Sequence, residues 1–268
     1  LLDLQRELSD VLTAWGRSYE IILVDDGSTD GSFSVLADIQ SRDNAVRVIR
    51  LRKNFGQTAA FAAGFAHARG RLIATSDGDL QNDPADLPAM VDKIDEGHDI
   101  VCGWRKQRQD PWLTRRLVSN IANWLISKTT GVHLHDYGCS LKVFRSEVIQ
   151  SLRLYGEMHR FIPALASEQG VRIHEVVVNH RPRRQGISKY GLSRMPRVVL
   201  DLVTVKFLLS YSTRPLQMFG PPGLLMGITG TAIVGYLGYV RLFAGQAIGD
   251  RPVSVSYTHL TLPTNREV

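Results

Sequence analysis

A regular alternation of short apolar runs with helical patterns constrains the fold more than any other feature of the sequence. The runs are rich in Val and Ile, and each precedes a stretch of helical length: YEIILVDD before SFSVLADIQ, VRVIRL before TAAFAAGFAHA, RLIATSD before LPAMVDKID, and DIVCGW before LVSNIANWLISK. Strands that alternate with such helices predict βαβ units and a mostly parallel sheet. The runs are continuous rather than alternating, as expected when helices cover both faces of a sheet. SLKVF and RIHEVVVNH are predicted to be further strands, with the helix RFIPALASEQ between them.

Polar residues follow the apolar runs, where ligands bind in sheets of this kind. Asp25 and Asp26 follow IILV, residues 54–57 follow VIRLRK, residues 77–81 follow LIATS, and Arg105 follows VCGW. We therefore expect four polar clusters to converge on one edge of the sheet.

Two of these clusters are acidic and suggest nucleotide and metal binding. In VDDGSTDG, a carboxylate of Asp25 or Asp26 could accept hydrogen bonds from a base or a ribose, although DDGS alone equally fits a well-capped turn. In SDGDLQNDP, Asp77 and Asp79 are two residues apart and Gln81 adds a third oxygen donor. Such hard ligands suit Mg²⁺ or Mn²⁺, and an ion with open positions would stabilise a leaving nucleoside diphosphate. A solvated acidic turn is the alternative reading.

The net charge of +6 is distributed unevenly along the chain. Basic residues gather before the apolar C-terminal stretch, which is typical of the cytoplasmic side of a membrane and of contact with lipid headgroups. Residues 191–212 mix Arg and Lys with Leu, Val and Phe, a pattern that suits helices on a membrane surface. A nucleic-acid partner is disfavoured because the sequence has no aromatic platform and no recognition motif.

A transmembrane helix is predicted at residues 215–243. No charged residue lies between Arg214 and Arg241, and that interval spans roughly 39 Å as a helix, more than the ~30 Å hydrocarbon core. A buried core helix is the alternative. Gly223 and Gly227 form a GxxxG pair, which suits close packing on another membrane helix, including one from a second copy of the chain.

The cysteines and the two ends of the chain complete this outline. Cys102 and Cys139 lie in no metal or disulfide motif, which fits a reducing cytosol. The chain starts without Met inside an apparent amphipathic helix, so we expect a truncated N-terminus. Residues 253–268 do not continue the preceding periodicity, and we expect this tail to be non-native.

The acidic clusters and the parallel order around them resemble family 2 inverting glycosyltransferases of the GT-A fold. NFGQTAAFAAGF, DGDLQNDP, RKQRQDPWLTRRLVSN, HDYGCSLKVFR and RQGISKYG occur in the order seen in polyprenyl-phosphate glycosyltransferases, over about residues 1 to 243. That group includes dolichyl-phosphate mannose synthases, polyprenyl-phosphate glucosyltransferases and the undecaprenyl-phosphate aminoarabinose transferase. The resemblance implies a GT-A catalytic domain at residues 1–190 that lacks its first strand, followed by interfacial helices at 191–214.

The same resemblance implies roles for individual residues. The metal-binding aspartates fall on Asp77 and Asp79, with Gln81 as a metal or phosphate contact. The residues implied on the donor side are Asp25, Asp26, Gln57, Asp77, Arg184, Ser188 and Lys189.

The residues implied in catalysis and acceptor binding are Asp79, Asp136, Arg105, Arg115 and Ser119. The two arginines and the serine match the acceptor-phosphate site, and a solvated helix charge is the alternative for each arginine. Asp136 is assigned to positioning of the acceptor or the sugar, or to work as a base, and a turn residue is the alternative. A lipid phosphate has a second pKa of ~6 and needs little help from a base. The protein must instead hold two like-charged phosphates, which calls for Arg, Lys and a metal.

The expected function is transfer of a sugar from a UDP- or GDP-sugar to an undecaprenyl or dolichyl phosphate, with Mg²⁺ or Mn²⁺, at the cytoplasmic face of the inner (plasma) membrane. Two alternatives stay open. One is a membrane-anchored glycosyltransferase with a polysaccharide acceptor. The other is a catalytically inactive scaffold subunit that binds a nucleotide.

Overall fold

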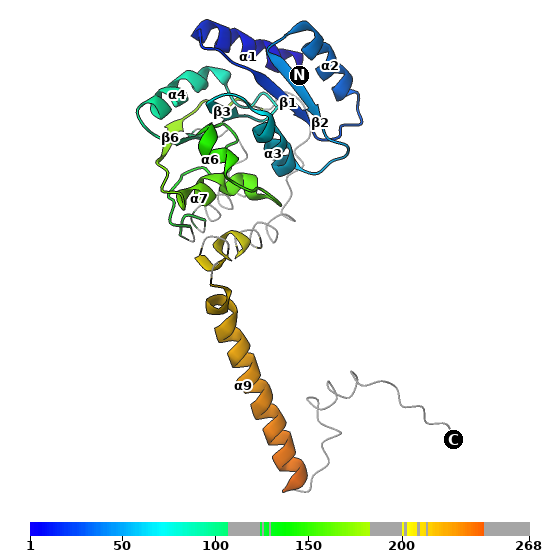
Figure 1. The fold of residues 1–268 in the computed structure, drawn as a ribbon, viewed down its shortest axis with the longest axis vertical. Coiled ribbons are helices and arrows are strands. Elements are labelled where there is room, and N and C mark those ends of the chain that lie inside the picture. Colours follow the sequence, from blue (N-terminus) through cyan, green and yellow to red (C-terminus); the bar gives the residue numbers. More distant parts are fainter. Residues whose placement is uncertain are drawn as a thin grey trace, which may run out of the picture. The chain divides into compact units, whose positions relative to one another are not determined.

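The computed structural model describes residues 1–106, 124, 126–128, 130–182, 200, 203–207, 210–212 and 214–243. The chain divides into two compact units, Leu1–Leu209 and Ser210–Val268 (Figure 1). The first unit carries every strand that is described, and each apolar run expected to be a strand forms one.

The first unit alternates strands and helices in the expected order. Its elements are α1 (Leu2–Trp15), β1 (Ile21–Asp25), α2 (Ser32–Arg42), β2 (Val46–Arg50), α3 (Gln57–His67), β3 (Leu72–Thr75), the 3₁₀ turn η1 (Pro84–Asp86), α4 (Leu87–Asp95), β4 (Ile100–Trp104), β5 (Lys142–Arg145), α6 (Ser146–Gln150), the 3₁₀ turn η2 (Met158–Phe161), α7 (Ile162–Ser167) and β6 (Ile173–Val177).

The strands form a parallel pair, β1–β2, and a mixed sheet of order β3–β5–β4–β6. β4 and β6 run parallel, whereas β5 runs antiparallel to both of its neighbours. Lys142, the first residue of β5, pairs with Thr75 at the end of β3 and with Cys102 in β4. The reversal of β5 therefore brings the start of this strand to the edge where β3 and β4 end.

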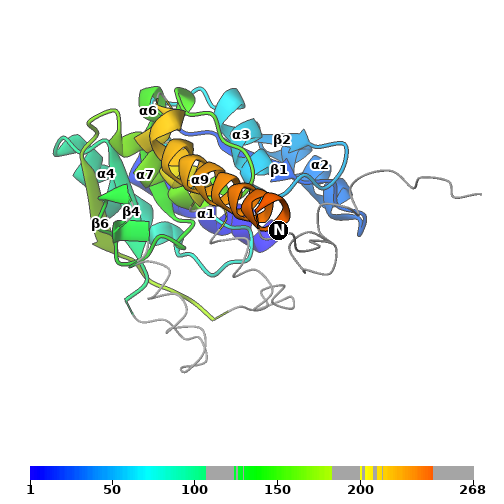
Figure 2. The ribbon, with the colours of Figure 1, turned by 90° about the horizontal axis from the view of Figure 1, so that it is seen from below.

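Helices lie around the strands of the first unit (Figure 2), and the packing of β5 shows that both faces of the mixed sheet are covered. Val143 packs in a cluster with Met90 and Ile94 of α4. The next residue, Phe144, packs in a second cluster with Phe65 of α3 and with residues of α6 and α7. Because successive side chains of a strand point to opposite faces, both faces are buried, which explains the continuous apolar runs of the sequence.

The short segment 203–207 belongs to the first unit and has one buried side. Val205 is fully buried in the cluster that contains Phe144, whereas Leu200 and Val203 are exposed. This is the pattern of an amphipathic helix, in the part of residues 191–214 that the structure describes.

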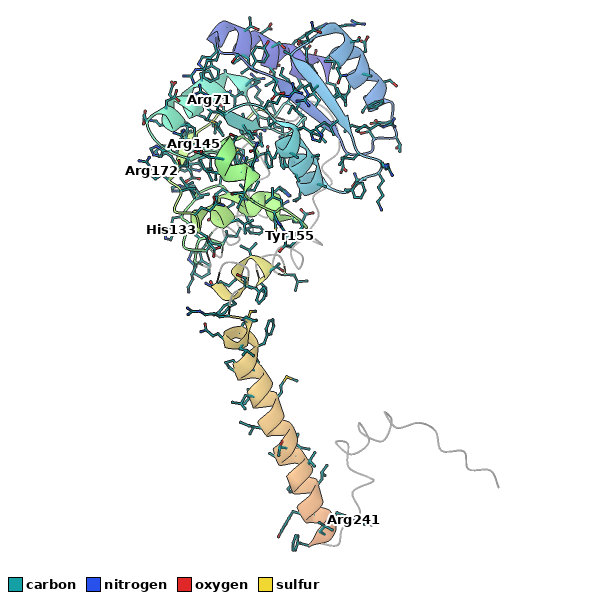
Figure 3. The ribbon with its side chains drawn as sticks, in the orientation of Figure 1. Arg71, His133, Arg145, Tyr155, Arg172 and Arg241 are labelled. Atoms are coloured by element: carbon teal, nitrogen blue, oxygen red, sulfur yellow. The ribbon has the colours of Figure 1, made fainter. Side chains whose placement is uncertain are left out.

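The second unit contains α9 (Pro215–Leu242), which matches the predicted apolar helix. By length and composition this helix could cross a membrane, with a mean hydropathy of 1.5 in its most apolar window, of which 6% is buried. Pro221 and Pro222 lie inside it, and Arg241 is in its last turn (Figure 3).

Phe144 offers a test of the packing. We expect Phe144→Ala to lower the free energy of unfolding by about 3–5 kcal/mol, because it leaves a cavity in the middle of the sheet. Urea unfolding followed by tryptophan fluorescence measures the change. Tyr155→Ala, at a residue that is 51% exposed, is the control and should change stability by less than about 1 kcal/mol. A loss at Phe144 no larger than that of the control would contradict this packing.

Candidate active site

Asp26, directly after β1, holds the loop in front of α3. Its Oδ1 accepts a hydrogen bond from the Phe55 amide at 2.7 Å, and its Oδ2 accepts one from the Gly56 amide at 2.8 Å. α3 begins after Gly56 without a side-chain cap from its own N-cap residue. The carboxylate of Asp26 therefore accepts hydrogen bonds from otherwise unpaired amides at the start of α3. Its negative charge also interacts favourably with the positive end of the helix dipole.

Asp25, the last residue of β1, is buried beside a tight turn. Its Oδ1 accepts a hydrogen bond from the Ser28 amide at 2.9 Å. Its Oδ2 is buried and has no hydrogen-bond partner among the described residues, and the Nε of Arg50 lies 3.9 Å away. The Arg50 guanidinium also lies over the ring of Phe33, 4.2 Å from its centroid. One oxygen of Asp25 thus keeps its hydrogen-bonding capacity.

Gly27 is required by the turn between these elements. Its φ is +70°, and a Cβ at this position would lie 2.5 Å from the carbonyl carbon of Lys53. A side chain would therefore force apart the loops that follow β1 and β2.

Asp77, after β3, is a half-buried carboxylate that residues of several segments surround. Gln57, the first residue of α3, donates a hydrogen bond from Nε2 to its Oδ1 at 2.6 Å. Burial raises the pKa of Asp77, and the negative charge of Asp79 adds to this effect. A hydrogen bond with Ser140 and the positive charges of Lys142 and Arg105 oppose the increase in pKa. Because the increase prevails, the ionised form of Asp77 is disfavoured, and a bound cation would relieve it.

The loop after Asp77 folds back tightly. Leu80 has a φ of +62°, which is uncommon for a residue with a Cβ and is found at strained functional sites. The Gln81 amide donates to Asp79 Oδ1 at 3.2 Å, and Asn82 Nδ2 donates to Ser76 Oγ and Ser140 Oγ at 3.2 and 2.9 Å. The loop is therefore fixed to its own start and to the residues before β5.

The oxygen ligands of this loop suit a divalent ion that the protein coordinates only in part. Asp77, Asp79 and Gln81 offer two carboxylates and one amide, and the described residues contain no group of three or more His, Cys, Asp or Glu side chains that could hold a metal ion. Mg²⁺ and Mn²⁺ accept such oxygen donors, and a site with few protein ligands leaves coordination positions for phosphate oxygens and water.

Arg105 and Asp136 form a bidentate ion pair beside this loop. The Nε and Nη2 of Arg105 lie 2.7 and 3.0 Å from the two carboxylate oxygens of Asp136. Burial lowers the pKa of Arg105, but the Asp136 carboxylate more than offsets this, so the net pKa is raised. Asp136 also accepts a hydrogen bond from the Gly138 amide at 3.1 Å and is 1% exposed. A geometry fixed in this way presents a permanent positive charge to the site.

Lys142 is a site residue that the sequence reading missed. It is 4% exposed, and its Nζ donates to the carbonyl oxygens of Tyr137, at 3.3 Å, and Cys139. Its charge acts on Asp77 from within the sheet. The available signal was a lysine inside the apolar strand SLKVF, which requires partners when it is buried.

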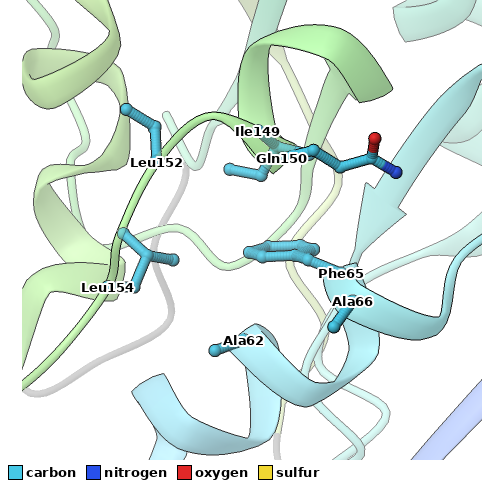
Figure 4. Close-up of a pocket in the computed structure, with 7 residues that line it drawn as sticks. All are labelled: Ala62, Phe65, Ala66, Ile149, Gln150, Leu152 and Leu154. Atoms are coloured by element: carbon cyan, nitrogen blue, oxygen red, sulfur yellow. The ribbon is translucent and has the colours of Figure 1, made fainter.

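The clusters at the strand ends thus converge as expected. Asp26 holds residues 55 and 56, the adjacent Gln57 binds Asp77, and the charge of Arg105 acts on Asp77. The predicted site residues Arg115, Ser119, Arg184, Ser188 and Lys189 lie outside the described residues. An apolar pocket between α3 and the segment of α6 and the residues after it has no charged lining residue and shares none with these clusters; it is lined by Ala62, Phe65, Ala66, Ile149, Gln150, Leu152 and Leu154 (Figure 4).

A mixed α/β sheet with acidic loops at the strand ends agrees with the GT-A fold of glycosyltransferases. The chain belongs to glycosyl transferase family 2, whose profile matches residues 3–153. The chain is 47% identical over 256 residues to the dodecaprenyl-phosphate galacturonate synthase of Rhizobium johnstonii, covering 93% of this chain and 75% of that protein. It is 40% identical over 231 residues to the undecaprenyl-phosphate 4-deoxy-4-formamido-L-arabinose transferase of Edwardsiella ictaluri, covering 86% of this chain and 69% of that protein.

Solved structures share the fold. Glucosyl-3-phosphoglycerate synthase of Mycobacterium tuberculosis, in complex with Mn²⁺, UDP and glucosyl-3-phosphoglycerate, superposes with a TM-score of 0.50 at 16% identity, covering 70% of this chain and 67% of that one. The same enzyme with UDP gives a TM-score of 0.51 at 15% identity, covering 75% and 73%.

The raised pKa of Asp77 predicts a pH-dependent cost to stability. A carboxyl whose pKa is higher in the folded state stabilises fully below its unfolded pKa, and this contribution is lost as the pH rises through the folded pKa. Asp77→Asn removes the charge and keeps an oxygen that can accept from Gln57. In the absence of divalent ions, we expect this variant to melt at a higher temperature than the wild type at pH 7, by roughly 2–4 °C for each kcal/mol relieved.

The difference should shrink as the pH is lowered below about 3.9, the pKa of an unperturbed aspartate, because the carboxyl is then protonated in both states. Differential scanning fluorimetry across this pH range measures it. Asp92→Asn, at an exposed position of α4, is the control. A constant difference at all pH values would show that the charge of Asp77 is not its cause.

Proposed function

We propose that this glycosyltransferase moves a sugar from a nucleoside-diphosphate sugar to a polyprenyl phosphate. The half-buried Asp77, next to Asp79 and opposed by the fixed Arg105, carries the proposal. In this arrangement the two carboxylates could bind a divalent ion with the donor diphosphate, and the arginine could bind the acceptor phosphate. Both curated relatives are named as enzymes that act with a polyprenyl phosphate, which supports the lipid acceptor.

The donor would bind over the ends of β1 and β3. The free Oδ2 of Asp25 is available to a hydrogen-bond donor of the nucleoside, and Asp26 keeps the start of α3 in place beside it. Asp77, Asp79 and Gln81 would hold Mg²⁺ or Mn²⁺, which would neutralise the charge that develops on the leaving nucleoside diphosphate. The solved relative of the same fold that contains Mn²⁺ and UDP supports this part. We assign Arg184, Ser188 and Lys189 to the donor diphosphate from the sequence alone.

The acceptor phosphate would approach Arg105. Arg115 and Ser119 are assigned to the same phosphate from the sequence. A phosphate that is already anionic needs no strong base, and the carboxylate of Asp136 is occupied by Arg105 and Gly138. We therefore assign Asp136 to the orientation of Arg105, and attack on the face opposite the leaving group would invert the anomeric centre.

Membrane attachment would come from the C-terminal part of the chain. α9 is long and apolar enough to span a bilayer, and among residues 200 and 203–207 Val205 is buried whereas Leu200 and Val203 are exposed. We propose that residues 191–214 lie on the membrane surface and that α9 anchors the enzyme, with its catalytic unit at the cytoplasmic face of the inner membrane. The basic residues before α9 agree with that orientation. Its small residues would also allow assembly with a second copy.

Sugar transfer by the detergent-solubilised protein tests the proposal. Mn²⁺, undecaprenyl phosphate and a panel of UDP- and GDP-sugars are supplied, and lipid-linked products are identified by mass spectrometry. We expect one donor to be used. Asp79→Ala should lower kcat/KM by at least about 10²–10³-fold, because the leaving diphosphate loses its ion. Asp92→Ala should leave it unchanged.

Full turnover by Asp79→Ala would contradict the metal role. Transfer to an oligosaccharide, with none to the lipid phosphate, would instead support a polysaccharide acceptor. Nucleotide-sugar binding without any transfer would support a scaffold subunit.

A further inference from the structure

Glu175, a residue of β6 without a role in the site described above, binds the loop that carries Asp136. Both carboxylate oxygens of Glu175 lie 2.9 Å from the His135 amide nitrogen. Its Oε1 also accepts from the Asp136 amide at 3.2 Å, and its Oε2 lies 2.8 Å from Nδ1 of His135. One carboxylate thus gathers two successive backbone amides and one ring nitrogen.

Glu175 is unusual for its place in the fold. It lies in a central part of the β4–β6 pairing, opposite Cys102, and its side chain is 10% exposed. A carboxylate this buried is costly unless several donors satisfy it. Here the donors belong to one loop, so the cost of burial is offset only when that loop has its present conformation.

The contacts of Glu175 continue directly to Arg105. The loop amides that Glu175 holds belong to the residues that place the Asp136 carboxylate, and that carboxylate binds Arg105 through two oxygens. The His135 ring, also bound by Glu175, stacks on Trp104 with centroids 4.1 Å apart. Trp104 is the residue before Arg105. Both the side chain of Arg105 and the backbone beside it are therefore tied to Glu175.

We propose that Glu175 is a positioning residue for sugar transfer, which fixes Arg105, through the Asp136 loop, in the orientation that receives the acceptor phosphate. This inference rests on the proposed function, because it assigns Arg105 to the acceptor. The proposal gives Glu175 no role in donor binding, because the hydrogen bonds of Asp25, Asp26 and Gln57 do not involve Glu175.

Glu175→Gln is the sharpest change, because it keeps the size of the side chain. A carboxylate accepts at both oxygens, whereas an amide accepts at one oxygen and presents a donor at the other position. The side-chain NH₂ of the glutamine would then face the backbone N–H of His135 or Asp136, or the His135 ring nitrogen, so that two donors would oppose each other. The loop should loosen without a cavity in the sheet.

A double-mutant cycle with Arg105→Ala tests whether Glu175 acts through Arg105. We expect Glu175→Gln to lower kcat/KM for undecaprenyl phosphate by roughly 10-fold or more, as small misplacements of catalytic groups do. KM for the nucleotide sugar should change by less than about 2-fold. In the Arg105→Ala background, Glu175→Gln should have no further effect beyond about 2-fold, because the group it positions is gone. Glu168→Gln, at an exposed position after α7, is the matched control.

Two results would overturn the proposal. One is a further loss of about 10-fold or more in the Arg105→Ala background, as expected from general destabilisation. The other is an equal rise in KM for both substrates.

Hydrogen–deuterium exchange supplies a readout that does not depend on turnover. Amides of residues 134–138 should exchange faster in Glu175→Gln than in the wild type, while those of α4 should not. If the wild type makes no lipid-linked sugar, the proposed acceptor is wrong, and faster exchange limited to this loop still shows that Glu175 holds it. Unchanged exchange would refute the positioning role whatever the acceptor.

Discussion

The site depends on the unfavourable partial burial of one carboxylate, that of Asp77 just after β3. Burial and the neighbouring Asp79 disfavour its charge, and the surrounding structure compensates only in part through Gln57, Ser140, Lys142 and Arg105. Those residues come from α3, from the start of β5 and from the end of β4. The requirement to compensate one charge therefore explains why these loops meet where they do. Under the proposed function, a divalent ion held by Asp77 would relieve the residual imbalance.

Buried side chains of opposite charge define the adjoining loop in the same way. Lys142 satisfies carbonyl oxygens of residues 137 and 139, whereas Glu175 accepts from the amides of residues 135 and 136. A loop of five residues is thus bound at its acceptors by a cation and at its donors by an anion. Such an arrangement is specific to one register. A shift of the loop by one residue would take the carbonyl oxygens away from the Lys142 ammonium and the amides away from the Glu175 carboxylate. Because Asp136 belongs to this loop and binds Arg105 through two oxygens, the loop also fixes the position of Arg105.

Much of this was predictable from the sequence because the governing signals are local. Continuous apolar runs gave the buried strands, and the polar residues after them gave the edge at which Asp26, Gln57, Asp77 and Arg105 meet. The direction of β5 was not predictable, since SLKVF reads the same in either orientation. Lys142 and Glu175 were missed for a related reason. Each lies inside a strand, where a charge is informative only once its neighbours across the sheet are known. The aspartate pair of DDGS shows the limit of motif reading, because Asp26 contacts backbone amides while Asp25 retains the free oxygen.

The reversed β5 also sets the order in which the protein can be built. β3 and β4 do not pair with each other, and both wait for a strand that follows them after a long stretch of chain. During synthesis, β1 and β2 can pair early, but the mixed sheet cannot close until β5 has left the ribosome, and β6 comes later still. Long-range pairing of this kind slows folding and prolongs the exposure of unpaired strand edges. Because α9 follows β6 in the chain, every described strand of the first unit leaves the ribosome before this apolar helix emerges.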